Sequence, residues 1–329
     1  MVRGIVLALP LALLACQASA QGSDAEPRWR VVADVPLGSK AARFDYQSFD
    51  PTAGRLWIAH MGADEVLAFD VRRRHVVARV PEMPGVTGVR AVPNLQRVFA
   101  ALGRGREVVV LDSRSGQVLA RVPGGRFPDG LAYAPGPNRL FISDEFGRQE
   151  LVVDVSSSTA RRPIPLDGEV GNTHYDSVAG RIWVAVQTRD ELVAIDPSTE
   201  QVVERVAVAG IAHPHGFSVD APRRLIYVTG EDNARLGILD LRTRRMLHTY
   251  PVGEEPDVLA LDPGMGRLYV GSESGVVAAF RVDGESLMPL ARYSAPHAHS
   301  IAVDPASHLV YLPLENVGGV PVLRILSLE

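Results

Sequence analysis

The sequence predicts an all-β protein: a seven-bladed β-propeller of four-stranded antiparallel blades, with the ring closed by the N-terminal strand completing the last blade. Two observations carry this prediction. A unit of about 42 residues recurs seven times, and the last unit lacks one strand that the start of the chain supplies. Repeats of this length that hold several short strands are typical of propellers.

The repeat is marked by a short run in which branched apolar residues flank an aromatic one, as in GRLWIA, NRLFIS and GRIWVA. The aromatic residues lie 42, 42, 42, 44, 42 and 42 positions apart and are Trp57, Phe99, Phe141, Trp183, Tyr227, Tyr269 and Tyr311. In five repeats an aspartate follows 13 positions later, at Asp70, Asp112, Asp154, Asp196 and Asp240. Pro and Gly turns separate the runs, without helical periodicity between them, so each repeat predicts one four-stranded blade.

The two ends of the chain predict how the ring closes. After Tyr311 only one more strand fits before Glu329, so the last blade lacks its outer strand. The run RWRVVADVPLG at 28–38 resembles the outer strands of other repeats, such as GQVLARVPGG. We therefore expect residues 28–329 to form one propeller domain, preceded by a short flexible linker at 21–27.

The first residues have the pattern of an export signal, in which Arg3 precedes an apolar run that ends at Ala15. Two processing sites are open. Cleavage after Ala20 would remove residues 1–20, whereas the run Leu-Leu-Ala-Cys would make 1–15 the signal and place a lipid on Cys16. Both predict a periplasmic or extracellular protein. The second predicts an outer-membrane-anchored lipoprotein whose only contact with the membrane is through Cys16.

Composition excludes several kinds of site. With a single cysteine, the fold has no intramolecular disulfide, no cysteine zinc site and no c-type haem. The phosphate-binding and dinucleotide-binding glycine motifs are absent, so no nucleotide cofactor is indicated. A net charge of −4 with interspersed signs argues against a nucleic-acid partner. We expect a monomer stabilised by its core.

The run Tyr227-Val228-Thr229 resembles the signature of the YVTN repeat propellers, which include the YncE-like periplasmic proteins, although Gly230 replaces the asparagine. The similarity covers the whole mature chain and extends more distantly to the seven-bladed lactonase-type propellers. It implies the propeller fold and export. It does not imply one activity, because propellers serve as enzymes, binding proteins and scaffolds.

Candidate site residues lie at the start of the innermost strands, where we expect them to face the central channel. Counting back 12 residues from each aromatic residue gives Asp45, Thr87, Asp129, Gly171, His215, Asp257 and His299. Counting back 14 gives Arg43, Gly85, Phe127, Glu169, His213, Glu255 and His297. Residues two apart on an extended segment point the same way, so the second set is expected behind or above the first. Four of the nine histidines fall in these two sets.

Imidazoles beside carboxylates are ligands for zinc, copper, nickel or iron. The predicted metal ligands are His215, His299, Asp257 and Asp45, and the other ligand-binding candidates are Asp129, His213, His297 and Glu255. If the protein is an enzyme, His215 or His299 would be the catalytic base. Alternatively, His215 in PHG and Asp129 in PDG only cap turns, and the channel is a structural polar one.

Three functions follow from this pattern. The first is an exported propeller that binds a small ligand in the central funnel, either through a metal or without one. The second is a metal-assisted hydrolase or lyase that acts on a lactone-like substrate, which the similarity to lactonase-type propellers favours. The third is a protein-interaction scaffold that uses its rim loops.

Overall fold

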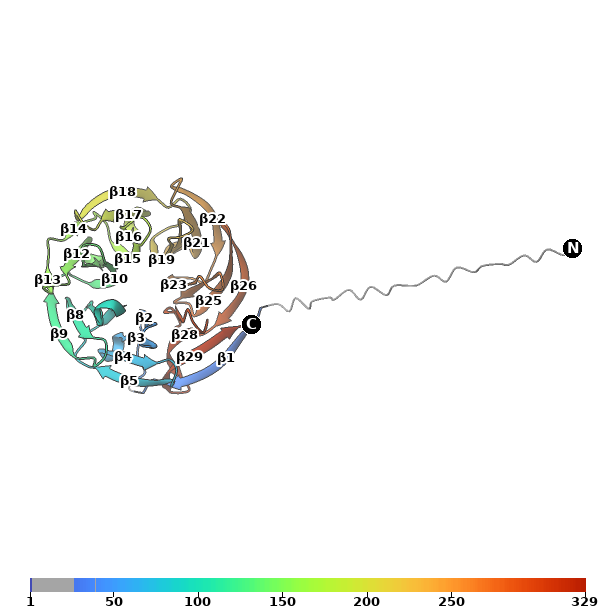
Figure 1. Cartoon of the computed structure of the whole chain (residues 1–329), viewed down its shortest axis with the longest axis horizontal. Helices are drawn as coiled ribbons and strands as arrows, with labels where there is room; N and C mark the ends of the chain where they lie inside the picture. The colour runs from blue at the N-terminus through green and yellow to red at the C-terminus, as the bar shows by residue number, and fades with distance from the viewer. Residues whose placement is uncertain (2–26, 39) are drawn as a thin grey trace.

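The structure is a computed structural model that describes Met1, residues 27–38 and residues 40–329. Seven β-sheets surround a central channel, and successive sheets follow one another around the ring (Figure 1). The predicted signal peptide, Cys16 and nearly all of the predicted linker at 21–27 lie outside the described residues. Within the described part of the chain, no helix is long and apolar enough to cross a membrane.

The first four blades run in chain order from the channel outward. Blade one contains β2 (Gln47–Asp50), β3 (Arg55–His60), β4 (Glu65–Asp70) and β5 (His75–Val80). Blade two contains β6 (Val86–Val92), β7 (Arg97–Leu102), β8 (Glu107–Asp112) and β9 (Val118–Pro123). Blade three contains β10 (Pro128–Ala134), β11 (Arg139–Asp144), β12 (Gln149–Asp154), β13 (Thr159–Ala160) and β14 (Ile164–Pro165). Blade four contains β15 (Val170–Asp176), β16 (Arg181–Val186), β17 (Glu191–Asp196) and β18 (Gln201–Ala207).

The remaining blades close the ring. Blade five contains β19 (Pro214–Asp220), β20 (Leu225–Gly230), β21 (Arg235–Asp240) and β22 (Arg245–Pro251). Blade six contains β23 (Pro256–Asp262), β24 (Arg267–Ser272), β25 (Val276–Asp283) and β26 (Ser286–Ser294). Blade seven contains β27 (Ala302–Val303), β28 (Val310–Val317), β29 (Val320–Leu328) and β1 (Trp29–Pro36). Short 3-10 turns lie at η1 (Met61–Ala63), η2 (Pro93–Leu95), η3 (Glu145–Gly147), η4 (Gln187–Arg189) and η5 (Glu231–Asn233).

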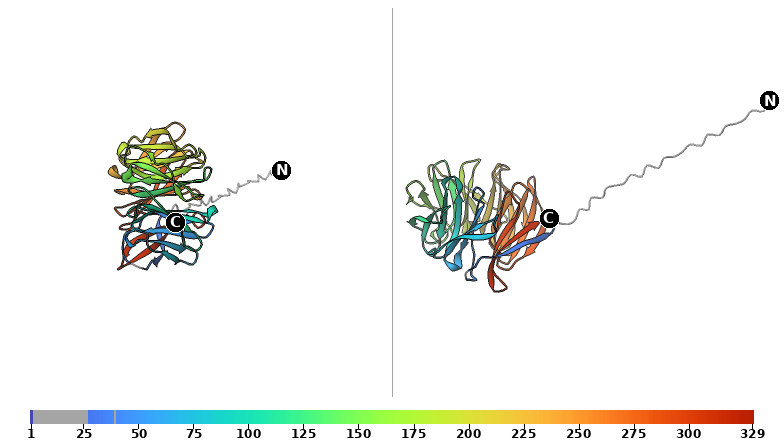
Figure 2. Two further views of the ribbon diagram at one scale, coloured as in Figure 1. Left: turned by 90° about the vertical axis from the view of Figure 1, so that its left-hand side faces the viewer. Right: turned by 60° about the horizontal axis from the view of Figure 1, so that its bottom comes forward.

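The predicted closure is confirmed. Strand β1 forms the outer edge of blade seven and pairs antiparallel with β29, from Trp29 opposite Leu328 to Pro36 opposite Val322. Figure 2 shows β1 lying alongside the last strands at the rim of the ring. Both ends of the described propeller therefore belong to one sheet, and the all-β, seven-bladed prediction holds.

The periodic aromatic residues pack between blades. Trp57 of blade one lies in a buried cluster with Val98 and Leu102 of blade two. The same relation continues around the ring until Tyr311 of blade seven packs with Leu56 of blade one. All seven aromatic side chains are buried. The spacing of 42 residues thus records one interface between neighbouring blades per repeat, and burial of such large side chains is a main source of stability.

The periodic aspartates have a local role at the ends of the third strands. The Oδ1 atom of Asp70 accepts the backbone N–H groups of Arg72 at 3.0 Å and Arg73 at 2.8 Å. Asp112 accepts the N–H groups of Arg114 and Ser115 in the same way. A short acidic side chain that bonds to the backbone two and three residues ahead stabilises a tight turn.

One blade departs from the regular pattern at its edge. In blade three the outer strand is split into β13 and β14, both of which pair with β12. The interruption coincides with Arg161, Arg162 and Pro163. Because proline lacks an N–H group, it cannot donate a hydrogen bond to the ladder at this point.

Candidate functional site

The start of the innermost strand is shaped by a β-bulge in blades two to six. In blade five, Pro214 pairs with Gly230 but the next pair is Phe217 with Val228, so the regular ladder skips His215 and Gly216. The same shift occurs at Thr87, Asp129, Gly171 and Asp257. A bulge redirects side chains and is common beside functional sites. In these five blades it explains why the residue 12 positions before the aromatic one faces the channel.

Glycines beside these bulges allow neighbouring blades to approach closely. A Cβ atom on Gly216 would lie 1.6 Å from the backbone oxygen of Asp257, and one on Gly88 would lie 2.1 Å from that of Asp129. Only glycine fits at such distances. The backbone of each innermost strand is thus held against the next, which fixes the positions of Asp129 and Asp257.

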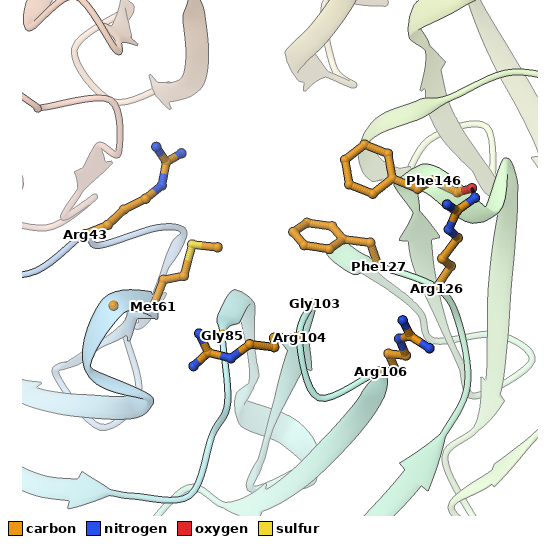
Figure 3. A pocket seen from close by; sticks show the side chains of 10 residues that line it. Arg43, Met61, Gly85, Gly103, Arg104, Arg106, Arg126, Phe127 and Phe146 are labelled. Carbon is orange, nitrogen blue, oxygen red and sulfur yellow. Dashed lines mark hydrogen bonds between the residues drawn. The ribbon is translucent and has the colours of Figure 1, made fainter.

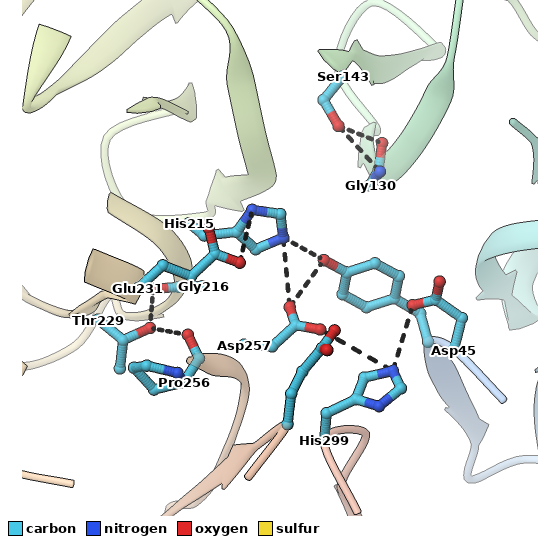
Figure 4. A network of polar contacts seen from close by, with 12 residues as sticks. Asp45, Gly130, Ser143, His215, Gly216, Thr229, Glu231, Pro256, Asp257 and His299 are labelled. Carbon is cyan, nitrogen blue, oxygen red and sulfur yellow. Dashed lines mark hydrogen bonds and ion pairs between the residues drawn. The ribbon is translucent and has the colours of Figure 1, made fainter. Parts of the chain in front are cut away.

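The channel brings together three side chains from blades one, six and seven. His299 Nε2 lies 3.9 Å from Asp45 Oδ1 and 4.0 Å from Asp257 Oδ2 (Figure 4). One ligand atom from each residue falls within 4.8 Å of the others. All three residues are buried, and His299 Nε2 has no hydrogen-bond partner in the described structure.

His215 lies next to this group and contacts it through Asp257. Its Nε2 is 3.2 Å from Asp257 Oδ1, and the hydroxyl of Tyr46 is 3.2 Å from the same nitrogen. The Tyr46 hydroxyl also lies 3.4 Å from Asp257 Oδ1. On its other side, His215 Nδ1 contacts the side-chain amide of Gln187. Both ring nitrogens are therefore engaged, in contrast to His299.

The buried charges of the channel shift one another. Burial alone would lower the pKa of His215, but its hydrogen bond to Asp257 and the nearby carboxylates raise it to about 10. Burial lowers the pKa of His299. Burial and the charges of Asp129 and Asp257 raise the pKa of Asp45 well above its usual range. At neutral pH the two imidazoles thus differ, with His215 cationic and His299 neutral.

Asp129 faces the same space from blade three. It is buried, and burial together with the charge of Asp257 raises its pKa to about 6, although His215 opposes the shift. Asp129, Asp45 and Asp257 line a cavity of about 200 Å³ with Tyr46 and His215. We refer to this cavity as the funnel.

The residues 14 positions before the aromatic ones do not join the cluster as one layer. His213, Glu255 and His297 occupy left-handed turns with φ of 55°, 52° and 63°. His297 and Glu255 are exposed, and Glu255 lines an acidic hollow of about 710 Å³ that shares Glu231 and Glu273 with the lining of the funnel. His213 is half-buried, and its Nδ1 lies 3.0 Å from Glu231 Oε2. The turn separates the two sets, because a left-handed residue breaks the extended geometry that would align them.

Two polar residues of the cluster escaped the sequence reasoning. Tyr46 follows Asp45 directly, at a position where three other blades have glycine (Gly88, Gly130 and Gly216). The occurrence of tyrosine at a position where three other blades have glycine was the signal that could have identified Tyr46. Gln187 lies in the turn η4 after the second strand of blade four, where no periodic pattern marks it.

Comparison with known proteins supports the fold and nothing finer. No family model matches the sequence, and no curated protein matches it significantly. Three solved propeller chains are similar in structure: Kuenenia stuttgartiensis hydrazine synthase, the WD40 repeats of RRP9, and virginiamycin B lyase from Staphylococcus aureus. Their TM-scores are 0.75, 0.77 and 0.74, at 15%, 13% and 9% identity. The matches cover 93%, 92% and 91% of this chain and 99%, 100% and 99% of those chains. Such identities show a shared fold alone, and the similarity to YVTN repeat proteins stays a prediction.

Proposed function

We propose that the protein binds a small ligand in the funnel through a divalent transition metal held by Asp45, Asp257 and His299. The observation that carries this proposal is the Nε2 atom of His299, which is buried, faces two carboxylates and has no hydrogen-bond partner in the described structure. A buried polar atom without a partner is costly, so its persistence beside two carboxyl groups favours a cation between them.

The donor set fits a zinc, copper, nickel or iron ion. Metal bonds to nitrogen and carboxylate oxygen are about 2.0–2.2 Å long, so atoms about 4 Å apart are close to the separation that one ion bridges. A cation would also offset the repulsion among the buried carboxylates. His215 contacts the carboxylate of Asp257 and would orient it as an outer-shell partner rather than as a ligand. Three protein ligands leave a coordination position for an atom of the bound molecule.

Calorimetric titration of zinc into chelator-treated protein tests the proposal. We expect about one site per chain in the wild type and loss of that site in His299→Ala. His75→Ala is the matched control because His75 is exposed at the start of β5, the outer strand of blade one, and its binding should equal that of the wild type. Substoichiometric zinc in the wild type, or an unchanged site in His299→Ala, would refute the metal site. If zinc binds as expected, elemental analysis of the untreated protein would identify the native metal.

A metal-assisted hydrolase or lyase is the second candidate. The hydroxyl of Tyr46 contacts both His215 and Asp257, which gives a connected group able to move a proton beside the proposed metal. His215 is then an acid rather than the base, because its pKa of about 10 keeps it protonated. His299 is neutral and could act as the base, but only if its imidazole does not hold the metal. Hydrolysis of model lactones that stops on chelation and in Tyr46→Phe would support this candidate, whereas zinc binding without turnover would favour binding alone.

A further inference from the structure

A second hollow opens beside the funnel, over blades one to three. It has a volume of about 590 Å³, and it shares Arg43, Met61 and Phe127 with the lining of the funnel. Figure 3 shows the rings of Phe127 and Phe146 and the sulfur of Met61 directed into the same space, with arginine side chains around it. We call it the arginine pocket. Its lining residues are Arg43, Met61, Gly62, Gly85, Gly103, Arg104, Arg106, Arg126, Phe127 and Phe146.

The pocket carries cationic groups without carboxylates of its own. Arg43 donates to Glu273 at 2.7 Å, and Arg104 is paired with Asp64. Arg106 and Arg126 have no carboxylate partner among the described residues. The only hydrogen bond of the Arg126 guanidinium there is a long one, at 3.5 Å, to the backbone oxygen of Phe146. Two guanidinium groups at one concave surface therefore remain available for an anion.

The pocket also exposes aromatic surface. The rings of Phe127 and Phe146 lie 5.1 Å apart and are tilted by 48°. Phe146 is 43% exposed. Its ring lines a hollow together with a second aromatic ring, whereas most exposed apolar side chains stand singly on the surface. Concave sites with aromatic walls and a few polar groups are typical of small-molecule binding.

Contacts of the backbone hold the aromatic wall of the pocket in place. A Cβ atom on Gly103 would lie 2.8 Å from the ring of Phe127, so glycine lets the ring occupy its position. On the other side of the loop, Asp144 Oδ1 accepts the backbone N–H groups of Arg126 and Phe127, each at 2.7 Å. The loop that presents both residues is thus fixed by a buried carboxylate, which reduces the entropy lost when a ligand binds.

We infer that the arginine pocket binds an organic carboxylate with a flat aromatic body, whose charge meets Arg106 and Arg126 and whose ring packs against Phe146. This inference rests on the proposed ligand-binding function because the pocket shares lining residues with the funnel, and it adds the class of ligand. The carboxylate accepts charge-assisted hydrogen bonds from the guanidinium groups, and the aromatic body covers the exposed ring.

Titration with 2-naphthoate, followed by its fluorescence, tests the inference on the full propeller. We expect saturable binding by the wild type and a Kd raised about tenfold or more in both Arg106→Ala/Arg126→Ala and Phe146→Ala. Arg73→Ala/Arg114→Ala is the matched control, because both arginines are exposed on outer turns, and its Kd should not change. The neutral analogue 2-naphthylmethanol and acetate should each bind at least about tenfold more weakly than 2-naphthoate.

The same variants distinguish this inference from the metal site. His299→Ala should lose zinc and still bind 2-naphthoate, whereas Arg106→Ala/Arg126→Ala should lose 2-naphthoate and still bind zinc. No saturable binding of 2-naphthoate by the wild type would overturn the inference. Equal binding of the neutral analogue, or equal loss in the control variant, would overturn it as well.

Discussion

Arg324 of β29 and Asp34 of β1 face each other across the closing strand pair and form a two-pronged ion pair. Arg324 Nε donates to Asp34 Oδ1 at 2.7 Å, and Nη2 donates to Oδ2 at 2.5 Å. The remaining nitrogen of Arg324 donates to the hydroxyl of Tyr293 in blade six at 3.0 Å. One guanidinium group therefore connects the first strand, the last strand and the neighbouring blade.

Loss of this pair should weaken closure. We expect Asp34→Asn to lower the free energy of unfolding by about 1 kcal/mol at pH 7, measured by urea denaturation. Arg324 lowers the pKa of Asp34. The stabilisation is therefore present above pH 4 and is lost as the pH falls through the lowered pKa, so the gap between wild type and variant should close towards pH 2. Glu329→Gln is the control, because its pair with Arg30 is exposed and should contribute little. A gap that does not change with pH would contradict this assignment.

Replacement by methionine should change the free energy of unfolding in opposite directions at Arg90 and at Arg224. Arg90 lines the channel, burial lowers its pKa, and in the described structure its Nε atom has no hydrogen-bond partner. Arg224 Nη1 instead donates to the buried carboxylate of Asp176 at 2.6 Å. We expect Arg90→Met to raise the free energy of unfolding by about 1–3 kcal/mol and Arg224→Met to lower it by about 3–5 kcal/mol. Equal signs in chemical denaturation would show that Arg90 is paired or fully hydrated in solution.

Close packing at the bulges predicts the cost of one added methyl group. Gly216→Ala would place a Cβ against the backbone of Asp257, so we expect a loss of about 1–3 kcal/mol or more, together with weakened zinc binding. Gly136→Ala is matched to it because nothing lies within 4 Å of its added Cβ, and it should change neither property. Thermal unfolding and zinc titration of the two variants measure both effects. A neutral Gly216→Ala would mean that the blades can separate freely at this point.

The imidazole of His215 should remain protonated across the neutral range in metal-free protein. Its pKa of about 10 lies above the unfolded value of about 6.5. Its contribution to stability is therefore complete below pH 6.5 and is lost as the pH rises towards 10. In Asp257→Asn the negative charge that raises this pKa is removed, and the pKa should fall. NMR titration of the histidine ring signals would measure both values, and a wild-type His215 that titrates near pH 6.5 would contradict the buried ion pair.

The fold could be predicted because every repeat makes the same contact with the next blade. Trp57 and its six counterparts bury their rings against the next blade, so their spacing in the sequence equals the spacing of the interfaces. The missing last strand and the spare first strand followed from the same count. The split edge of blade three was not predicted, since an outer strand tolerates a proline that the periodic core residues do not register.

The site could be predicted only where it follows the repeat. Asp45, His215, Asp257 and His299 occupy one position of the repeat, and the structure places them together. Glu255 and His297 also follow a fixed spacing, but the left-handed turn directs them outward. The arginine pocket could not be predicted in this way.

Three of its lining residues, Arg43, Gly85 and Phe127, occupy one position of the repeat, but its two unpaired arginines do not. Arg106 follows the second strand of blade two, whereas Arg126 precedes the first strand of blade three. Their proximity results from the curvature of the ring, which no short window of sequence records.

The pairing of β1 with β29 sets the order in which the protein can be completed during synthesis. Residues 29–36 leave the ribosome first, but their strand partner, residues 320–328, is made last. Six sheets are built from consecutive segments of the chain, while the seventh needs both ends of the described propeller. A chain truncated before Val320 would therefore leave its first strand unpaired and its edge open to other chains.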